Sequence, residues 1–243
     1  MHSYRLSEIS IFGVLFFLLF FSCIESNTDL SGNNADQVAR NIEVAINKEK
    51  WDRTKWIQWT FPGPRNYLWD RERNYLETDW DHYRVVMDLN TKKGLAYSND
   101  TLLFEEDLRS ILDKAWSNFC NDAFWLNAPA KLFDPGTKRS LVTREDTLRL
   151  KVEYTSGGVT PGDYYLWNFD QNYLPTSFEM YVSVISEPGV LATWERWKKL
   201  ESGAMIAPKH TIGSKDLTLS NIKSGDDFTD FQKTEDPFLE LIN

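Results

Sequence analysis

The chain consists largely of short aromatic and β-branched runs that are separated by turns of hairpin length. The runs lie at residues 56–61, 66–70, 75–78, 82–89, 95–98, 148–154, 165–169, 178–184, 191–198, 205–212 and 217–222. Leu148, Leu150, Val152 and Tyr154 alternate with polar residues, as in a strand that buries one face. Parallel strands need crossover connections of a dozen or more residues, so turns this short predict antiparallel pairing.

Two segments have helical periodicity instead. Residues 35–48 place Val38, Ile42 and Ile46 on one face, and residues 102–119 carry apolar residues at helical spacing opposite a row of acidic ones. A long twisted antiparallel sheet must curl or close, and a helix that emerges midway can cover its concave face. We therefore predict a mainly β protein with helices (α+β), in which a curved antiparallel sheet forms an open half-barrel covered by a central helix.

The N-terminus has the pattern of a bacterial lipoprotein signal peptide. Arg5 precedes an apolar stretch over residues 11–21, which is too short to span a bilayer as a helix of roughly 20 residues. Ser22 and Cys23 then complete a sequence that resembles a lipobox. We expect the segment to be removed and the thiol of Cys23 to carry a diacylglyceryl group. Because Phe20 stands where Leu is usual, an ordinary secretory signal with an incidental cysteine stays open.

These features divide the chain into four parts. We predict a lipoprotein signal peptide at 1–22, a flexible tether at 23–34, a single half-barrel domain at 35–223 and a loosely attached acidic C-terminal tail at 224–243. In Gram-negative bacteria, Asp directly after the lipidated cysteine retains a lipoprotein in the inner membrane. Because this position is Ile24, we predict an outer-membrane lipoprotein that faces the periplasm. Glu25 leaves exposure on the cell surface open.

The charge of the chain restricts its partners. The formal net charge is −9, without a basic run, so we expect no nucleic acid partner. Anionic lipid headgroups would repel such a surface, so membrane association should come from the acyl anchor.

The residues that carry chemistry are few. After lipidation Cys120 is the one remaining cysteine, and His82 and His210 belong to no ligand motif. We expect Cys120 to be a small buried hydrophobe. The sequence therefore predicts no catalytic residues, no metal site and no cofactor, and a protein that is not an enzyme.

Several spaced motifs fall in an order that resembles a known family. They are Trp51, Trp56-Ile57-Gln58-Trp59-Thr60-Phe61, Tyr67-Leu68-Trp69-Asp70, Met87-Asp88-Leu89-Asn90, Gly94-Leu95-Ala96-Tyr97, Phe124-Trp125-Leu126, Lys131-Leu132-Phe133-Asp134-Pro135-Gly136, Leu150-Lys151-Val152-Glu153-Tyr154 and Gly158-Val159-Thr160-Pro161-Gly162-Asp163-Tyr164. Over roughly residues 35–222 they resemble uncharacterised Gram-negative outer-membrane lipoproteins with a fold like that of the lipoprotein localisation factors (LolA/LolB-like). The resemblance implies an open β half-barrel with a helix lid, whose best-known members carry acyl chains in an apolar cavity. It transfers no functional residue.

The aromatic residues are the candidate ligand contacts. Aromatics make up 14% of the chain, with ten Trp, which is enough to line a cavity between sheet and helix. We expect the protein to bind a lipid or other apolar or acylated ligand without catalysis, through Trp56, Trp59, Trp69, Trp116, Phe119, Trp125 and Trp167. The same side chains would also fill a core, which would make the protein an interaction scaffold.

A glycan-directed role is the alternative. Asp70, Glu72, Asp79 and Asp81 lie close together in sequence beside Trp69 and Trp80. Paired carboxyl groups roughly 5–10 Å apart, with aromatic platforms, would suit glycan binding or hydrolysis. Acids that are simply solvated at hairpin ends would give the same pattern.

Overall fold

The computed structural model describes residues 32–156 and 160–242, so the signal peptide, Cys23 and most of the predicted tether lie outside the described residues. The first half contains α1 (Gly32–Ala45), α2 (Lys48–Asp52), β1 (Trp56–Phe61), β2 (Arg65–Asp70), β3 (Tyr75–Trp80), β4 (Tyr83–Asp88), β5 (Lys93–Ser98), β6 (Thr101–Leu102), α3 (Glu105–Asn127) and the 3-10 turn η1 (Ala128–Ala130). The second half contains β7 (Thr137–Arg144), β8 (Thr147–Tyr154), β9 (Tyr164–Phe169), β10 (Pro175–Tyr181), β11 (Val190–Thr193), β12 (Lys198–Lys199), β13 (Met205–Ile206), β14 (Lys209–Ile212), β15 (Lys215–Thr218), β16 (Ser220–Gly225), η2 (Phe228–Phe231) and α4 (Leu239–Ile242).

Most of the strands form two open antiparallel sheets that are joined by one bent stretch of chain, and β12 and β13 pair separately as a two-stranded ribbon. The first sheet has the order β16-β1-β2-β3-β4-β5-β6 and the second β15-β14-β11-β10-β9-β8-β7. β15 ends the second sheet and β16 ends the first, and the buried Leu219 between them donates its N–H to the carbonyl of Pro208 at 2.8 Å. The predicted fold class is confirmed, and the curved sheet divides at this bend.

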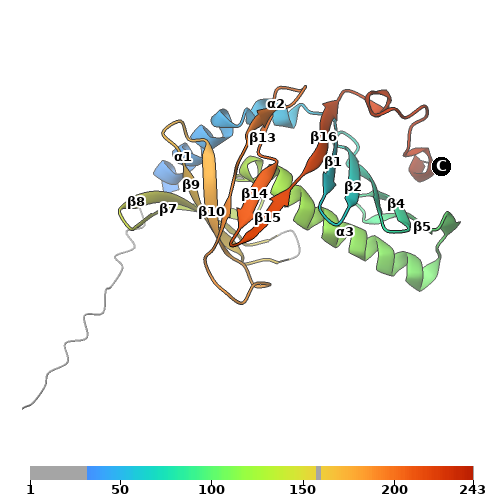
Figure 1. Cartoon of the computed structure of the whole chain (residues 1–243), viewed down its shortest axis with the longest axis horizontal. Coiled ribbons are helices and arrows are strands. Elements are labelled where there is room, and N and C mark those ends of the chain that lie inside the picture. The colour runs from blue at the N-terminus through green and yellow to red at the C-terminus, as the bar shows by residue number, and fades with distance from the viewer. Residues whose placement is uncertain (1–31, 157–159, 243) are drawn as a thin grey trace, which may run out of the picture.

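The central helix α3 packs against both sheets. Figure 1 shows α3 extending along both sheets, with α1 near the far end of the second. α3 contacts β4 and β5 of the first sheet, while near its C-terminus the Trp125 ring lies 5.7 Å from that of Phe178 in β10. α1 packs on β7 and β8. The helix predicted over 102–119 continues to Asn127, because the apolar stretch after Cys120 extends the same buried face.

Strand register sorts the side chains of the first sheet into two faces. Trp69 pairs with Leu76 and both face the core, as does Trp80, whose ring is 4% exposed. Because neighbouring residues of a strand point in opposite directions, Asp70 and Asp79 face away from the core. This division decides which of the predicted site residues can meet.

The C-terminal segment packs against the outer face of the first sheet. Phe231 and Phe238 are 9% and 0% exposed, and they pack with Trp56. Arg73 forms two hydrogen bonds to Asp236, at 2.6 and 3.0 Å. The prediction of loose attachment is therefore wrong for the segment after β16, because its phenylalanines supply apolar anchors within an acidic stretch.

Of the helices in the described ranges, none is long and apolar enough to cross a membrane.

Candidate functional site

The predicted ligand contacts fall into three separate aromatic clusters. Under α3, Trp59 stacks on Tyr67 at 4.6 Å, and Phe119 lies 5.1 Å from Trp69 and 6.5 Å from Trp116. In the second sheet, Phe178 lies 4.9 Å from Trp167 and 5.7 Å from Trp125. Trp56 is on the opposite face of the first sheet, 5.5 Å from Phe238.

These clusters are packed ring against ring. Trp59 is 1% exposed and Trp167 is fully buried, and ring separations of about 4.5–7 Å are those of directly packed aromatic side chains. The space beneath α3 is therefore occupied by the protein's own side chains. Trp116 differs, because it is half-buried and the Nζ of Lys92 lies 4.3 Å from its ring centroid.

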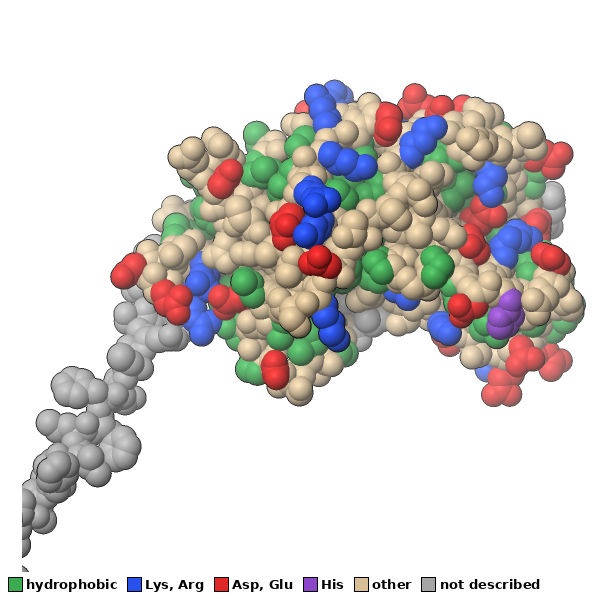
Figure 2. All heavy atoms as spheres, viewed as in Figure 1, with side chains coloured by type: hydrophobic (Ala, Val, Ile, Leu, Met, Phe, Trp, Pro, Cys, Tyr) green, Lys and Arg blue, Asp and Glu red, His purple; other side chains and the backbone are tan. Residues whose placement is uncertain are grey.

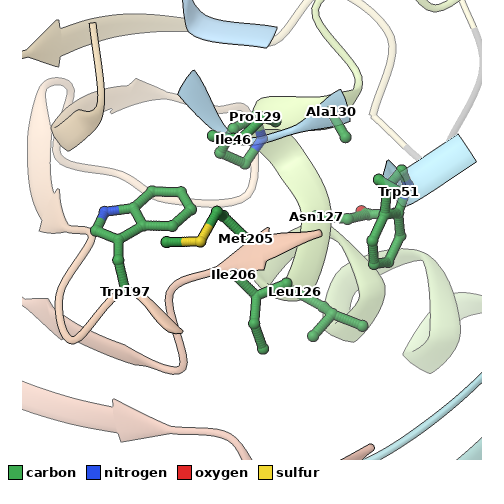
Figure 3. A pocket seen from close by; sticks show the side chains of 9 residues that line it. All are labelled: Ile46, Trp51, Leu126, Asn127, Pro129, Ala130, Trp197, Met205 and Ile206. Carbon is green, nitrogen blue, oxygen red and sulfur yellow. The ribbon is translucent and has the colours of Figure 1, made fainter. Parts of the chain in front are cut away.

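An apolar recess lies instead at the C-terminal end of α3 (Figure 3). Its volume is about 230 Å³ including the open solvent at its mouth, and the lining side chains leave enclosed room for about one water. The lining residues are Ile46, Trp51, Leu126, Asn127, Pro129, Ala130, Trp197, Met205 and Ile206.

The walls of this recess come from segments far apart in sequence. Ile46 follows α1, Trp51 lies in α2, and Met205 begins the short ribbon strand β13. Two contacts hold the ribbon to the α1–α2 corner: the N–H of Met205 donates to the carbonyl of Ile46 at 3.0 Å, and Asn47 Nδ2 donates to the carbonyl of Gly203 at 3.0 Å. The recess could not be predicted from sequence, where Trp51 and Leu126 belong to two separate family motifs and Ile46 to the apolar face of the first helix.

The half-buried Arg71 packs against Trp51, which forms the α2 wall of the recess. The guanidinium carbon of Arg71 lies 4.4 Å from the Trp51 ring centroid and 5.1 Å from that of Trp69, and the side chain donates to the carbonyls of Trp51 and Thr54. Burial lowers the pKa of Arg71 to about 10, so the group stays charged at neutral pH. Its charge is directed to backbone carbonyls and the recess itself is lined by uncharged side chains.

His210 is also surrounded by aromatic rings, close to the C-terminal end of α3. Its ring lies 5.1 Å from Trp125 and 4.5 Å from Trp194, and Nδ1 lies 2.9 Å from the carbonyl oxygen of Thr193. Burial lowers the pKa of the imidazole to about 4. His210 is therefore neutral at physiological pH.

The acids of the alternative glycan site do not meet the tryptophans beside them in sequence. Asp70 is 2% exposed and pairs with Arg73, and Asp79 accepts a hydrogen bond from Asn66 Nδ2 at 2.8 Å on the outer face. Trp69 and Trp80 belong to the core on the inner face. Glu72 lies 4.0 Å from Lys55, and Asp81 is exposed in the turn after β3.

A second, polar pocket occupies that outer face. It is lined by Gln58, Asn66, Tyr67, Leu68, Glu77, Asp79 and Lys233. Its amide and carboxylate groups come from β1, β2 and β3, and the C-terminal segment supplies Lys233 as one wall.

The other candidate residues show no sign of a metal or nucleophile site. In the described parts of the chain, no three His, Cys, Asp or Glu residues are grouped so that they could hold a metal ion. Cys120 is half-buried, and burial raises the pKa of its thiol to about 11, which keeps it protonated at neutral pH. Figure 2 shows basic and acidic side chains interspersed on the face in view.

Among known proteins, remote structural similarity is found without a sequence match. Neither models of protein families nor curated proteins give a match. Among solved structures, the chain is similar to a DUF1329 family protein from Desulfovibrio piger ATCC 29098. The two share 9% sequence identity with a TM-score of 0.40, over 80% of this chain and 96% of that chain.

Proposed function

We propose that this protein is a non-catalytic lipoprotein, anchored in the outer membrane through Cys23 and facing the periplasm, that binds a lipid or other acylated ligand. The observation that carries the proposal is the apolar recess at the end of α3. Five of its lining residues, Ile46, Trp51, Leu126, Ala130 and Ile206, also belong to the main hydrophobic core. A ligand that enters there would contact the core directly.

Entry requires the mouth of the recess to rearrange. Trp197 and Met205 are half-buried, whereas the deeper lining residues are buried. Met is unbranched and adapts its shape readily, so Met205 is the side chain best suited to move. Each buried methylene contributes about 0.8 kcal/mol, so a chain of about six methylenes that displaces the side chains at the mouth would gain about 5 kcal/mol, equivalent to a Kd of about 0.2 mM. Tighter binding needs a longer chain that also displaces core side chains.

The test measures binding of the uncharged apolar fluorophore N-phenyl-1-naphthylamine to the purified full chain, with native mass spectrometry of protein extracted from cell envelopes. Met205→Lys places a charge at the mouth and should weaken binding about tenfold or more. Leu191→Lys is the matched control, because Leu191 is 48% exposed on β11 and lies outside the recess. It should bind as the wild type does.

Three results would contradict the proposal in different ways. If no lipid co-purifies and the fluorophore does not bind, the aromatic side chains only fill the core, as expected for an interaction scaffold. Equal loss in the Met205 and Leu191 variants would mean a general effect of added charge. Loss in Trp116→Lys, without loss in the Met205 variant, would move the site to the cluster under α3.

Glycan binding without hydrolysis is the second candidate function, and the polar pocket beside Lys233 favours it. Its amide and carboxylate groups lie on one face of the sheet and could bond to sugar hydroxyls, but the core-facing tryptophans cannot serve it as platforms. Asp79→Ala should abolish retention on immobilised envelope polysaccharide if this function is correct. Unchanged retention of that variant would exclude the pocket.

A further inference from the structure

Asn127 sets the polarity of the apolar recess. It is 6% exposed, ends α3, and is the one lining residue whose side chain is neither hydrocarbon, thioether nor indole. No group in the described residues donates a hydrogen bond to its Oδ1. A buried oxygen without a donor costs about 1–3 kcal/mol, which a suitable ligand group would recover. Figure 3 shows this carboxamide beside Trp51, among the side chains that line the recess.

The surroundings of Asn127 also select against negative charge. The last turn of α3 carries no basic residue, and the C-terminal end of a helix bears a partial negative charge from its carbonyl groups. None of the nine lining side chains is cationic, and the guanidinium of Arg71 is engaged by the carbonyls of Trp51 and Thr54. An ionised carboxylate would therefore enter a dry site without a counter-charge, where the Nδ2 group of Asn127 is the one side-chain donor apart from the indole N–H groups.

We propose that the recess binds apolar chains that carry one uncharged hydrogen-bond donor, a hydroxyl or an amide N–H, which donates to Asn127 Oδ1, and that it excludes ionised fatty acids. This inference rests on the proposed function, because it names the ligand class of the same recess. The apolar part of the ligand contacts Leu126, Ile206 and Trp197, and the donor group lies at the end of α3.

The test compares two isomers that differ only in the donor. 1-Nonanol has a hydroxyl, whereas methyl octyl ether has the same atoms and no donor, and nonanoate is the charged comparison. Each competes with N-phenyl-1-naphthylamine for the full-length protein. We expect the alcohol to bind about tenfold more tightly than the ether, and nonanoate to bind least at pH 7.5.

The variant Asn127→Leu tests whether Asn127 causes the preference for the alcohol over the ether. Replacing an unpaired buried polar group by an apolar one of similar size is nearly neutral or stabilising, so the variant should fold. It should bind alcohol and ether equally while still binding the fluorophore. Asn118→Leu is the control, since Asn118 lies on the same helix outside the recess, and it should keep the tenfold preference.

The results separate this inference from the proposed function. Fluorophore binding without any preference between alcohol and ether in the wild type would overturn the donor inference and leave apolar binding intact. A preference that survives Asn127→Leu would also overturn it. Absence of fluorophore binding would contradict the proposed function itself. The comparison of isomers on the wild type needs no variant, so misfolding of Asn127→Leu would not prevent a decision.

Discussion

At the scale of single residues, His210 makes stability depend on pH in the acidic range. The imidazole has a pKa of about 4 in the folded protein and about 6.5 in an unfolded chain. As the pH falls below 6.5 the unfolded chain takes up a proton that the folded protein does not, so stability decreases until about pH 4. The difference of about 2.5 units corresponds to a loss of about 3 kcal/mol.

Urea unfolding at pH 7.5 and pH 4.5 measures this loss. His210→Leu should lose less stability between the two pH values than the wild type, whatever its stability at pH 7.5. His82→Gln, at an exposed position, should behave as the wild type does. Equal pH dependence in wild type and His210→Leu would show that the carboxylates alone determine acid sensitivity.

Asp122 is a second buried residue on which stability should depend. Its carboxylate is fully buried and accepts hydrogen bonds from Arg65 at 2.6 and 2.9 Å, from Tyr67 at 2.6 Å and from Asn121 at 2.8 Å. Burial is the main reason why the pKa of the Tyr67 hydroxyl lies far above its usual range, and Asp122 adds to it. This group ties α3 to β2.

Removing that carboxylate should be costly. Asp122→Ala leaves an arginine and a tyrosine hydroxyl without their partner, and we expect a loss of about 3 kcal/mol because Arg65 keeps some contact with water. Asp113→Ala, at an exposed position of the same helix, should change stability by less than about 0.5 kcal/mol. Similar urea midpoints for the two variants would mean that α3 does not depend on this contact.

At the scale of elements, the hairpins could be predicted and the exceptions have physical causes. Strands such as β1 and β8 are bounded by turn residues, so local sequence determines where they lie. The predicted alternation of β8 holds from Leu150 to Glu153, but at its start Leu148 is exposed and Arg149 is buried, where Arg149 pairs with Glu179. β7 was missed because it is an edge strand with a mostly polar sequence, and its pairing with β8 defines it. The run predicted at 205–212 divides at Pro208, which has no N–H to continue a ladder.

The attachment of the C-terminal segment to the first sheet can be tested at Phe238. Phe238 is fully buried against Trp56 and Tyr75, and Arg73 lies 5.3 Å from its ring centroid. Phe238→Ala should remove about 3–5 kcal/mol of packing. Because the segment is terminal, we expect local release before global unfolding.

Hydrogen exchange detects that release. Phe238→Ala should raise exchange in residues 226–242 while α3 stays protected. Ile242→Ala, at a position that is 58% exposed, should leave exchange unchanged. Continued protection of the segment in the Phe238 variant would show that its ion pairs alone hold it to the sheet.

At the scale of the whole molecule, the candidate site escaped sequence analysis because it is assembled from distant segments. The aromatic residues that the sequence singles out mostly fill the core, as Trp59 and Trp167 do. The recess combines Ile46, Leu126, Trp197 and Met205, which no local pattern relates to one another. Asn127 gave no signal either, since an Asn before Ala128-Pro129 is typical of a helix end.

The proposed anchor would keep this recess near a membrane. Eight residues separate Cys23 from Gly32, the first residue of α1, and a fully extended chain of that length spans at most about 28 Å. α1 has 14 residues and is therefore about 21 Å long, with Ile46 of the recess just after it. The mouth of the recess would then lie within roughly 50 Å of the bilayer surface.

Lipidation of Cys23 is the prediction on which this arrangement depends. Cys23→Ala should abolish incorporation of labelled palmitate and move the protein from the membrane fraction to the soluble fraction, because the acidic surface offers no electrostatic attraction to anionic lipid. Cys120→Ser is the matched control, since it removes the other cysteine of the chain, and it should keep both label and membrane association. If Cys23→Ala still sediments with membranes, the protein is held there by another contact, and the limit on the distance between recess and bilayer no longer applies.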